Sequence, residues 1–333
     1  MTHLWVRAES RANETRVAIT PDGARSLRAA GFRITVEDSA TRCISDEAYR
    51  GAGADMAETG SWPKAPEDAI IIGLKELPKS DHPLSHRHVM FGHAYKGQLA
   101  GQELLRRLRA GGGTLLDLEY LTDATGRRLA AFGYWAGYAG AAVSLRVWAA
   151  QQGSRTLAGL RACSSATHML AELQSDLVAS GAHRPTALII GAKGRVGTGV
   201  SDLCNAMGVA TAKWDVEETA SGGPFPEVLS HQVFFNCVLA MPGTPIFVPA
   251  NAAHQPRTIT VVGDIACDPD SNFSPVKVYD RITSWDVPAW RVAEKPPLDV
   301  MAIDNLPSLL PLESSEDFAS QLLPVLREIQ NKD

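Results

Sequence analysis

Short apolar runs alternate along the chain with segments in which apolar residues recur at helical spacing. In the first part of the chain, the apolar runs predict strands over residues 4–7, 33–37, 69–74, 89–93 and 114–118. The segments between them predict helices over residues 20–30, 46–51 and 97–110. Strands that alternate with helices are typical of a parallel sheet with right-handed crossovers.

The same pattern continues in the second part of the chain. A long apolar helix is expected over residues 133–151, followed by a more polar and mostly helical segment over 152–183. Further strands are expected over 187–190, 211–214, 233–236 and 259–263, and a last helix over 315–330. A chain of 333 residues is too long for one ordinary core. The pattern therefore predicts an α/β fold with two Rossmann-like domains, whose parallel sheets flank an inter-domain cleft at the carboxyl ends of the strands.

The strand at 187–190 leads directly into three glycines and then into a helix expected over residues 198–207. Gly191 permits a tight turn, Gly194 lets the backbone approach a pyrophosphate, and Gly197 lets helix and strand pack closely. The free N–H groups at the start of the helix favour phosphate. The spacing is Gly-x-x-Gly-x-x-Gly rather than the usual Gly-x-Gly-x-x-Gly, so a tight turn without a ligand is the alternative.

Polar residues also end the later strands of this second domain. Asp215 follows the strand at 211–214, where an acid would accept hydrogen bonds from a ribose and would repel a 2′-phosphate. NAD is therefore predicted as the cofactor in preference to NADP, although Arg195 could face either kind of phosphate. Cys237 and Asp264 occupy similar strand-end positions.

Composition and charge make several other classes of protein poor candidates. Apolar residues make up 45% of the chain and charged residues 21%, which is ordinary for a globular protein. The formal net charge is −5 and no run of Lys and Arg occurs, so neither nucleic acid nor an anionic membrane is an expected partner. The apolar stretch at 129–145 is shorter than the roughly 20 residues of a membrane span, and a buried helix is expected there.

Cysteine and histidine usage adds to this picture. The five cysteines are scattered and the N-terminus lacks a signal-peptide layout, so a reducing compartment, the cytoplasm, is expected. The His-rich segment at 81–88 lacks the usual metal-ligand spacing and is expected to be a solvated loop, with no metal bound. The expected partner is a small-molecule substrate, and the chain is expected to be a monomer or a weak homo-oligomer.

Ionisable residues follow the strands of the first domain, at the edge where the cleft is expected. Lys75 and Glu76 follow one predicted strand, His93 and Lys96 follow the next, and Glu119 follows the last. A Lys in a cleft loses proton affinity and a His titrates near neutral pH, whereas the two glutamates would keep the cluster protonated longer. The group is typical of an acid–base pair, and a solvated ion pair is the alternative.

Arginines lie near these strand ends in the sequence. Arg16 precedes the first predicted helix, and Arg127 and Arg128 follow the last predicted strand of the first domain. Arginine binds carboxylates through two hydrogen bonds, so several arginines around one cleft would suit a polycarboxylate substrate. Each of them taken alone is more readily explained as a surface arginine.

A set of short motifs extends over nearly the whole chain. The motifs are Glu-x-Arg-x-Ala-x-Thr-Pro from Glu14, Gly-Leu-Lys-Glu from Gly73, Phe-x-His-x-Tyr-Lys from Phe91, Asp-Leu-Glu-Tyr from Asp117, Gly-Arg-Arg-x-x-Ala-Phe-Gly from Gly126, Gly-Ala-x-Gly-Arg-x-Gly from Gly191, Lys-Trp-Asp from Lys213, Gly-Gly-Pro-Phe from Gly222, Asn-Cys from Asn236 and Ile-Asp-x-Leu-Pro-Ser-Leu-Leu-Pro from Ile303. In combination they resemble the lysine-forming, NAD-dependent saccharopine dehydrogenase family, which belongs with alanine dehydrogenase and the transhydrogenases.

The resemblance implies a reaction, a domain order and a set of site residues. The family oxidatively deaminates saccharopine to lysine and 2-oxoglutarate. The order of the motifs implies that residues 1–131 and 312–333 form a discontinuous substrate and catalytic domain, and residues 132–311 the NAD-binding domain. Lys75 and His93 would be the acid–base pair, with Glu76 and Glu119 tuning their basicity and Lys96 nearby. The expected substrate contacts are Arg16, Lys75, Gln98, Arg128 and Phe132. The expected dinucleotide contacts are Arg127, Gly191, Gly194, Arg195, Gly197, Asp215, Thr219, Leu239, Ile265, Ile303, Asp304, Asn305 and Leu306.

The chain also departs from the family pattern. The fungal enzyme has a cysteine in its glycine loop that pairs with the cysteine of the Asn-Cys motif, whereas this chain has Val196 there, so Cys237 is expected to be a free thiol. Residues 152–183 do not match clearly. Two alternatives therefore stay open: a related amino-acid or opine dehydrogenase with a different substrate, and an NAD-binding protein without catalysis.

Overall fold

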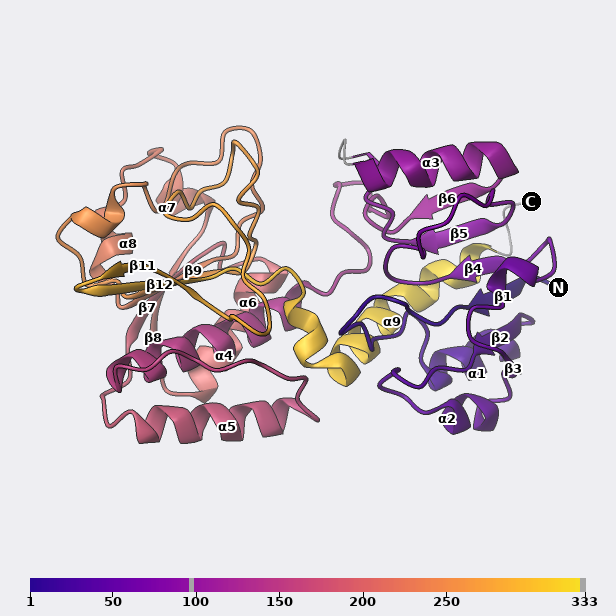
Figure 1. Cartoon of the computed structure of the whole chain (residues 1–333), viewed down its shortest axis with the longest axis horizontal. Coiled ribbons are helices and arrows are strands. Elements are labelled where there is room, and N and C mark those ends of the chain that lie inside the picture. Colours follow the sequence, from indigo (N-terminus) through magenta and orange to yellow (C-terminus); the bar gives the residue numbers. More distant parts are fainter. Residues whose placement is uncertain (96–98, 330–333) are drawn as a thin grey trace. The chain divides into compact units, whose positions relative to one another are not determined.

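The computed structural model describes residues 1–95 and 99–329. The chain divides into two compact units (Figure 1). One unit is formed by Met1–Ala131 together with Pro311–Asp333, and the other by Phe132–Leu310. Each unit contains its own six-stranded sheet.

The first unit has an all-parallel sheet with the strand order β3-β2-β1-β4-β5-β6. The order reverses direction between β1 and β4, as in the Rossmann fold. The strands are β1 (His3–Val6), β2 (Arg33–Glu37), β3 (Asp55–Ala57), β4 (Ile70–Ile72), β5 (Arg87–Met90) and β6 (Thr114–Asp117). The helices are α1 (Pro21–Ala29), α2 (Asp46–Gly51), the 3₁₀ turn η1 (Trp62–Lys64), α3 (Leu99–Gly111) and α9 (Pro311–Glu328).

The last helix of the chain belongs to this first unit. α9 packs against α1, and the hydroxyl of Ser315 accepts a hydrogen bond of 3.0 Å from the backbone N–H of Val17. Phe318 and Leu322 of α9 are buried. The helix begins at Pro311, a residue suited to the first turn, rather than at the predicted residue 315.

The second unit has the sheet order β11-β12-β10-β9-β7-β8. Its strands are β7 (Thr186–Ile190), β8 (Ala210–Trp214), β9 (Val233–Asn236), β10 (Val261–Asp264), β11 (Trp290–Glu294) and β12 (Pro297–Met301). Its helices are α4 (Gly133–Gln152), α5 (Ala166–Ala179), α6 (Arg195–Ala206), α7 (Val216–Thr219) and α8 (Pro226–Ser230), with 3₁₀ turns η2 (Ala252–His254) and η3 (Leu306–Leu309).

The prediction of an α/β fold with two Rossmann-like, mainly parallel sheets is confirmed, with three corrections. β11 pairs antiparallel with β12, and neither of these strands was predicted, because the segment at 290–301 lacks a clear apolar run. The short strand β3 and the short helices α7 and α8 were also missed. In the segment 152–183, only Ala166–Ala179 forms a helix after α4 ends at Gln152.

The apolar stretch that continues into α4 lies in a protein core. α4 is buried on nearly all sides and packs against α6, and the two backbones approach closely at glycines of each helix. A Cβ atom on Gly137 would lie 1.9 Å from the carbonyl oxygen of Val196, and one on Gly199 would lie 2.0 Å from that of Tyr134. In the part of the chain that the structure describes, no helix is long and apolar enough to cross a membrane.

A buried histidine gives the first unit a pH-dependent stability. His88 on β5 is buried beside Trp62, and within the described residues neither of its ring nitrogens has a hydrogen-bond partner. Burial, followed by the nearby charges of His86 and Arg7, lowers the pKa of His88 to about 3. The folded chain therefore holds His88 neutral where the unfolded chain would protonate it.

We predict that this histidine weakens the fold in acid. Because the pKa is lowered in the folded state, the free energy of unfolding should fall as the pH drops below 6.5, by up to about 1.4 kcal/mol per pH unit. His88→Leu should remove this contribution and flatten the acid limb of stability in urea unfolding between pH 7 and 5. An equally steep acid limb in the variant would contradict the assignment.

Candidate functional site

Three of the predicted site residues follow strands that are neighbours in the first sheet. Lys75 lies beyond the end of β4, His93 beyond β5 and Glu119 beyond β6, and these strands are adjacent in the order β4-β5-β6. All three strands are parallel, so their carboxyl ends lie at one edge of the sheet.

Glu119 joins two of the other predicted residues. Its Oε2 lies 3.2 Å from Nδ1 of His93, and its Oε1 accepts a hydrogen bond of 3.1 Å from Nη2 of Arg128. The Glu119 side chain is only 6% exposed, whereas those of His93 and Arg128 are 37% and 39% exposed. The buried carboxylate of Glu119 therefore orients both the ring of His93 and the guanidinium of Arg128. Glu119 contacts Nδ1 of His93 and not Nε2.

The backbone at His93 is held in an unusual conformation. His93 has a φ of +47°, in the left-handed region that residues with a Cβ seldom occupy. Oδ1 of Asp117, the last residue of β6, accepts hydrogen bonds from the N–H groups of Gly92 at 3.2 Å and Glu119 at 3.0 Å. Asp117 thus ties together the turns that carry His93 and Glu119. Our sequence interpretation gave it no role, and only its position at a strand end could have pointed to it.

Lys75 is half-buried and lies in the field of a buried carboxylate, Glu14. Burial by itself would raise the pKa of Glu14, but hydrogen bonds and charge from Arg16, with a further contribution from Lys75, hold that pKa below its ordinary value. Glu76 lies on the exposed side, 3.8 Å from Nε of Arg11. Glu14, which the sequence interpretation did not single out, is therefore a carboxylate that interacts electrostatically with Lys75.

The two arginines expected to contact substrate differ in their accessibility. Arg16 is 3% exposed and binds Glu14 with both ends of its guanidinium, through Nε to Oε1 at 2.8 Å and Nη2 to Oε2 at 2.6 Å. Arg128 has a partly exposed side chain. Lys96 and Gln98 lie outside the described residues. Phe132 is the half-buried residue that precedes α4.

The glycine loop of the second unit assigns a different physical role to each glycine. Gly191 has a φ of +86°, and a Cβ on it would lie 3.1 Å from the backbone of Cys237. A Cβ on Gly197 would lie 2.2 Å from the carbonyl oxygen of Gly191, so helix and loop meet here without space for a side chain. A Cβ on the exposed Gly194 would meet only the Gly191 oxygen, at 3.4 Å. The protein itself therefore requires Gly191 and Gly197, whereas Gly194 leaves open backbone.

The helix that follows begins earlier than predicted. α6 starts at Arg195 with Gly194 as its N-cap, and no side chain caps its first N–H groups. Gly197 consequently lies inside the first turn of the helix. Uncapped N–H groups beside an exposed glycine form a surface that suits a phosphate.

Asp215 lies beside this loop and closes one side of a pocket. Its Oδ2 accepts a hydrogen bond of 2.9 Å from the backbone N–H of Lys193, and its Oδ1 one of 3.0 Å from that of Val216. The pocket has a volume of about 360 Å³. Its lining includes Gly191, Asp215, Thr219, Gly222, Val238 and Phe247. The size and the mixed polar and apolar walls suit a nucleoside.

A buried polar chain supports the wall of this pocket. Oδ1 of Asp264 accepts a hydrogen bond of 2.8 Å from Asn236, and Oδ2 accepts one of 2.7 Å from the hydroxyl of Tyr279. The Asn236 side chain in turn accepts a bond of 3.1 Å from the N–H of Val238. Burial raises the pKa of Asp264 to about 6. The segment after β9, where Cys237 is a free thiol, is thereby fixed against Gly191.

The remaining predicted dinucleotide contacts fall into two groups. Ile265, Ile303 and Leu306 are buried in the apolar core around α4. Leu239, Arg127 and Asp304 are exposed, and Asn305, Thr219 and Arg195 are half-buried. The buried members have side chains committed to the core, so any ligand contact there would come from the main chain. No group of His, Cys, Asp and Glu suited to a metal ion occurs among the described residues.

Comparisons with known proteins place this arrangement in a wider class. Residues 5–139 match the family described as alanine dehydrogenase/PNT, N-terminal domain. The solved structure of an L-alanine dehydrogenase superposes with a TM-score of 0.69 at 19% identity, covering 99% of this chain and 90% of that one. A transhydrogenase from Sinorhizobium meliloti gives a TM-score of 0.66 at 17% identity, covering 98% and 94%. The fold is that of the alanine dehydrogenase and transhydrogenase class.

Curated sequences define the family within that class. The chain is 42% identical to "Saccharopine dehydrogenase [NAD(+), L-lysine-forming]" of Yarrowia lipolytica, over 99% of this chain and 93% of that protein. It is also 42% identical to the protein of the same name from Schizosaccharomyces pombe, over 99% and 94%. The chain belongs to the saccharopine dehydrogenase (NAD+, L-lysine-forming) family.

The geometry of the glycine loop gives a prediction about stability alone. Gly197→Ala should destabilise the chain by about 2–3 kcal/mol or more, because its Cβ would be forced into main-chain atoms that have little freedom to move. Gly194→Ala should cost about 1 kcal/mol or less, since its Cβ has room. Urea unfolding of both variants measures the difference, and equal costs would show that the loop packs differently.

Proposed function

We propose that this protein is an NAD-dependent dehydrogenase that oxidatively deaminates saccharopine to L-lysine and 2-oxoglutarate, in a reversible reaction. The observation that carries the proposal is the contact of one buried carboxylate, Glu119, with both His93 and Arg128. The contact supports the proposal because a histidine ring that could transfer protons then lies beside a guanidinium that could bind a substrate carboxylate. Family membership along 99% of the chain supports the choice of substrate.

The second unit is proposed to hold the cofactor. The open backbone at Gly194 and the uncapped N–H groups of α6 suit a pyrophosphate, and the pocket beside Asp215 and Thr219 suits an adenosine. When bound, NAD would supply the acceptor for a hydride from the carbon that carries the secondary amine. The two hydrogen bonds that Asp215 accepts from main-chain N–H groups hold its carboxylate toward this pocket.

The first unit is proposed to carry the proton transfers. Lys75 and His93 would remove the proton of the secondary amine, activate the water that hydrolyses the oxidised carbon–nitrogen bond, and deliver protons to the departing lysine amine. Overall, saccharopine, NAD⁺ and water give lysine, 2-oxoglutarate, NADH and a proton. Glu119 would orient His93, and Glu14 would act on the charge of Lys75. Glu76 and Lys96 would have at most supporting roles.

One feature favours a second candidate, a related amino-acid or opine dehydrogenase with a different substrate. The guanidinium of Arg16 is buried and bound to both oxygens of Glu14, so of the two arginines expected to contact substrate Arg128 is the accessible one. A substrate with fewer carboxylates than saccharopine would need fewer such partners. NAD-linked absorbance assays with saccharopine, with lysine plus 2-oxoglutarate, and with a panel of other amine and keto-acid pairs decide between the two candidates.

The proposed compartment and partners of the enzyme follow from its cysteines and its net charge. The cysteines of this chain, all within the described residues, are free thiols, which supports a reducing compartment such as the cytoplasm. A formal net charge of −5 makes nucleic acid a poor partner. We propose that the protein acts as a monomer or a weak homo-oligomer.

The acid–base pair predicts a loss of turnover without a loss of cofactor binding. Lys75→Met and His93→Gln should each lower kcat by roughly 10²- to 10⁴-fold, the usual contribution of a positioned acid or base. NAD affinity should change little, because the proposed cofactor residues other than Arg127 lie in the other unit. The double variant should lose less than the product of the two effects. Wild-type turnover in both single variants would show that Lys75 and His93 are not the acid–base pair.

Cofactor choice gives a separate prediction. Asp215 should make the protein prefer NAD to NADP, since its carboxylate would meet a 2′-phosphate of like charge. Asp215→Ala should weaken NAD binding and reduce the preference for NAD over NADP. The measurement is kcat/KM with each cofactor, and comparable values for both cofactors in the wild-type protein would refute the assignment.

A further inference from the structure

A buried ion pair lies beside Lys75 and has no part in the chemistry proposed above. Nη1 of Arg7 lies 3.3 Å from Oε2 of Glu9, and the two side chains are 1% and 8% exposed. Both residues follow β1, the strand that pairs with β4, beyond whose end Lys75 lies. Burying two charges costs desolvation energy, so the hydrogen bonds that the pair makes identify what it holds in place.

The ion pair binds both polar groups of the Lys75 main chain. Oε1 of Glu9 accepts a hydrogen bond of 2.6 Å from the N–H of Leu74, and Oε2 accepts one of 3.1 Å from the N–H of Lys75. The guanidinium of Arg7 donates through Nη2 to the carbonyl oxygen of Lys75. The last strand-like contact before this point is the bond of 3.1 Å from the N–H of Phe91 to the carbonyl of Leu74. At Lys75, therefore, side chains rather than a neighbouring strand bind the main-chain N–H and carbonyl groups.

Gly73 provides the space through which Arg7 reaches this position. A Cβ built on Gly73 would lie 2.3 Å from Nε of Arg7 and 2.6 Å from its Cζ and Nη2. Those three atoms are the nearest ones to that Cβ, and all belong to the end of a flexible side chain. A methyl group at residue 73 would thus displace the Arg7 guanidinium before it disturbed any other group.

We propose that Arg7, Glu9 and Gly73 form a clamp that fixes the main chain of Lys75 and thereby aims its amine at the reacting atoms. The inference rests on the proposed function, and it makes the three residues positioning residues that act through Lys75. Proton transfer tolerates little displacement, and a shift of about 1 Å can cost on the order of 10²-fold in rate. A group beyond the end of a strand needs such support, because the sheet no longer holds it.

The first test removes each part of the clamp. Gly73→Ala, Arg7→Met and Glu9→Gln should each lower kcat by about 10- to 100-fold and leave the KM for NAD within about twofold. In a Lys75→Met background, none of the three should lower the residual kcat further, because the group that they position is absent. A structural role would give the same loss in both backgrounds and would overturn the proposal.

The second test separates Gly73 from general effects of its substitution. Gly73→Ala should lower kcat in the wild-type protein but have no further effect in an Arg7→Met background, where the clashing guanidinium is gone. Additive losses from Gly73→Ala and Arg7→Met would show that Gly73 acts by another route and would remove it from the clamp.

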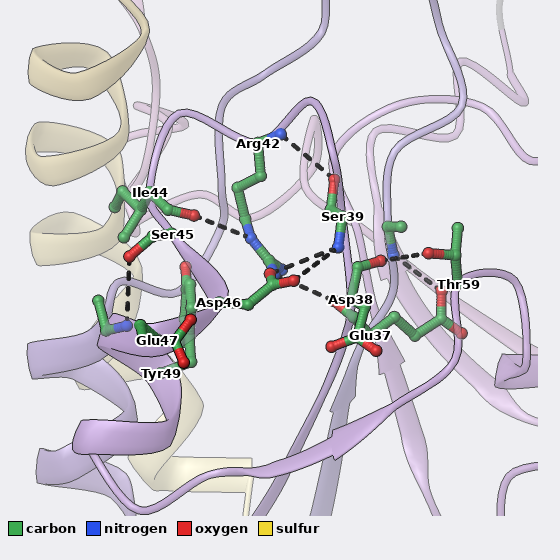
Figure 2. A network of polar contacts seen from close by, with 12 residues as sticks. Glu37, Asp38, Ser39, Arg42, Ile44, Ser45, Asp46, Glu47, Tyr49 and Thr59 are labelled. Atoms are coloured by element: carbon green, nitrogen blue, oxygen red, sulfur yellow. Dashed lines mark hydrogen bonds and ion pairs between the residues drawn. The ribbon is translucent and has the colours of Figure 1, made fainter.

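Arg42 provides a matched control (Figure 2). It is a buried arginine of the same unit, with a side chain 4% exposed, paired with Asp46 and donating 3.0 Å to the carbonyl of Glu37. It resembles Arg7 in burial, in having a carboxylate partner and in binding main-chain oxygen, but the groups that it binds are Asp46 and the carbonyls of Glu37 and Ile44 rather than Lys75. Arg42→Met should lower stability to a similar extent and leave kcat within about twofold. A kcat loss as large as that of Arg7→Met would contradict a role specific to Arg7.

The last measurement does not depend on the identity of the substrate. The rate at which acetic anhydride labels Lys75, followed by mass spectrometry of its peptide and compared with that of the exposed Lys79, reports the surroundings of the amine directly. The clamp variants should change this ratio at least threefold, and Arg42→Met should not. If saccharopine is not turned over but the ratio changes, the proposed function fails and the clamp stands. If saccharopine is turned over and the ratio is unchanged, the clamp is refuted.

Discussion

Hydrogen bonds to carboxylates at the ends of parallel strands are the interaction on which both candidate sites depend. A parallel sheet leaves main-chain groups and ionisable side chains together at one edge, beyond the last ladder hydrogen bond. In the first unit, Glu9 accepts hydrogen bonds from the N–H groups of Leu74 and Lys75. Glu119 contacts the ring of His93 and accepts a hydrogen bond from Arg128. In the second unit, Asp215 accepts hydrogen bonds from the N–H groups of Lys193 and Val216.

Two other carboxylates, Glu14 and Asp264, show how burial affects the charge near the sites. A buried acid is costly unless hydrogen bonds and cations stabilise its charged form. Glu14 meets this requirement through Arg16 and has a lowered pKa, whereas Asp264 has only two neutral hydrogen-bond donors among its contacts and has a pKa raised to about 6. A buried carboxyl group is therefore held charged beside Arg16 and is more easily protonated behind the proposed cofactor pocket.

Glycines contribute by the absence of a side chain, and the structure separates their roles. Gly197 and Gly199 allow main chains to touch, and Gly73 makes room for a single guanidinium. Among the described residues, a Cβ on Gly194 would meet only the Gly191 oxygen, at 3.4 Å, so the backbone of Gly194 is open. A glycine is thus required by packing when protein atoms occupy the place where its Cβ would lie. A glycine with open space at that place is not required for this reason.

Much of the fold could be predicted from the sequence because its signals are local. Apolar runs such as Ile70–Ile72, the glycines after β7 and the acid at Asp215 each follow from a pattern within a few residues. β11 and β12 escaped prediction because the segment at 290–301 lacks a continuous apolar run. The start of α6 was misplaced because a glycine can cap a helix as well as break it.

The sequence by itself determined the fold class, the succession of strands and helices, and the residue types at the strand ends. Only the tertiary structure decided which partner each charged residue takes. Glu76 faces Arg11, and Glu119 rather than Glu76 contacts His93. The reason is physical: an ionic contact depends on the distance and burial of groups that are far apart in the chain, and the spacing of residues along the sequence carries neither quantity.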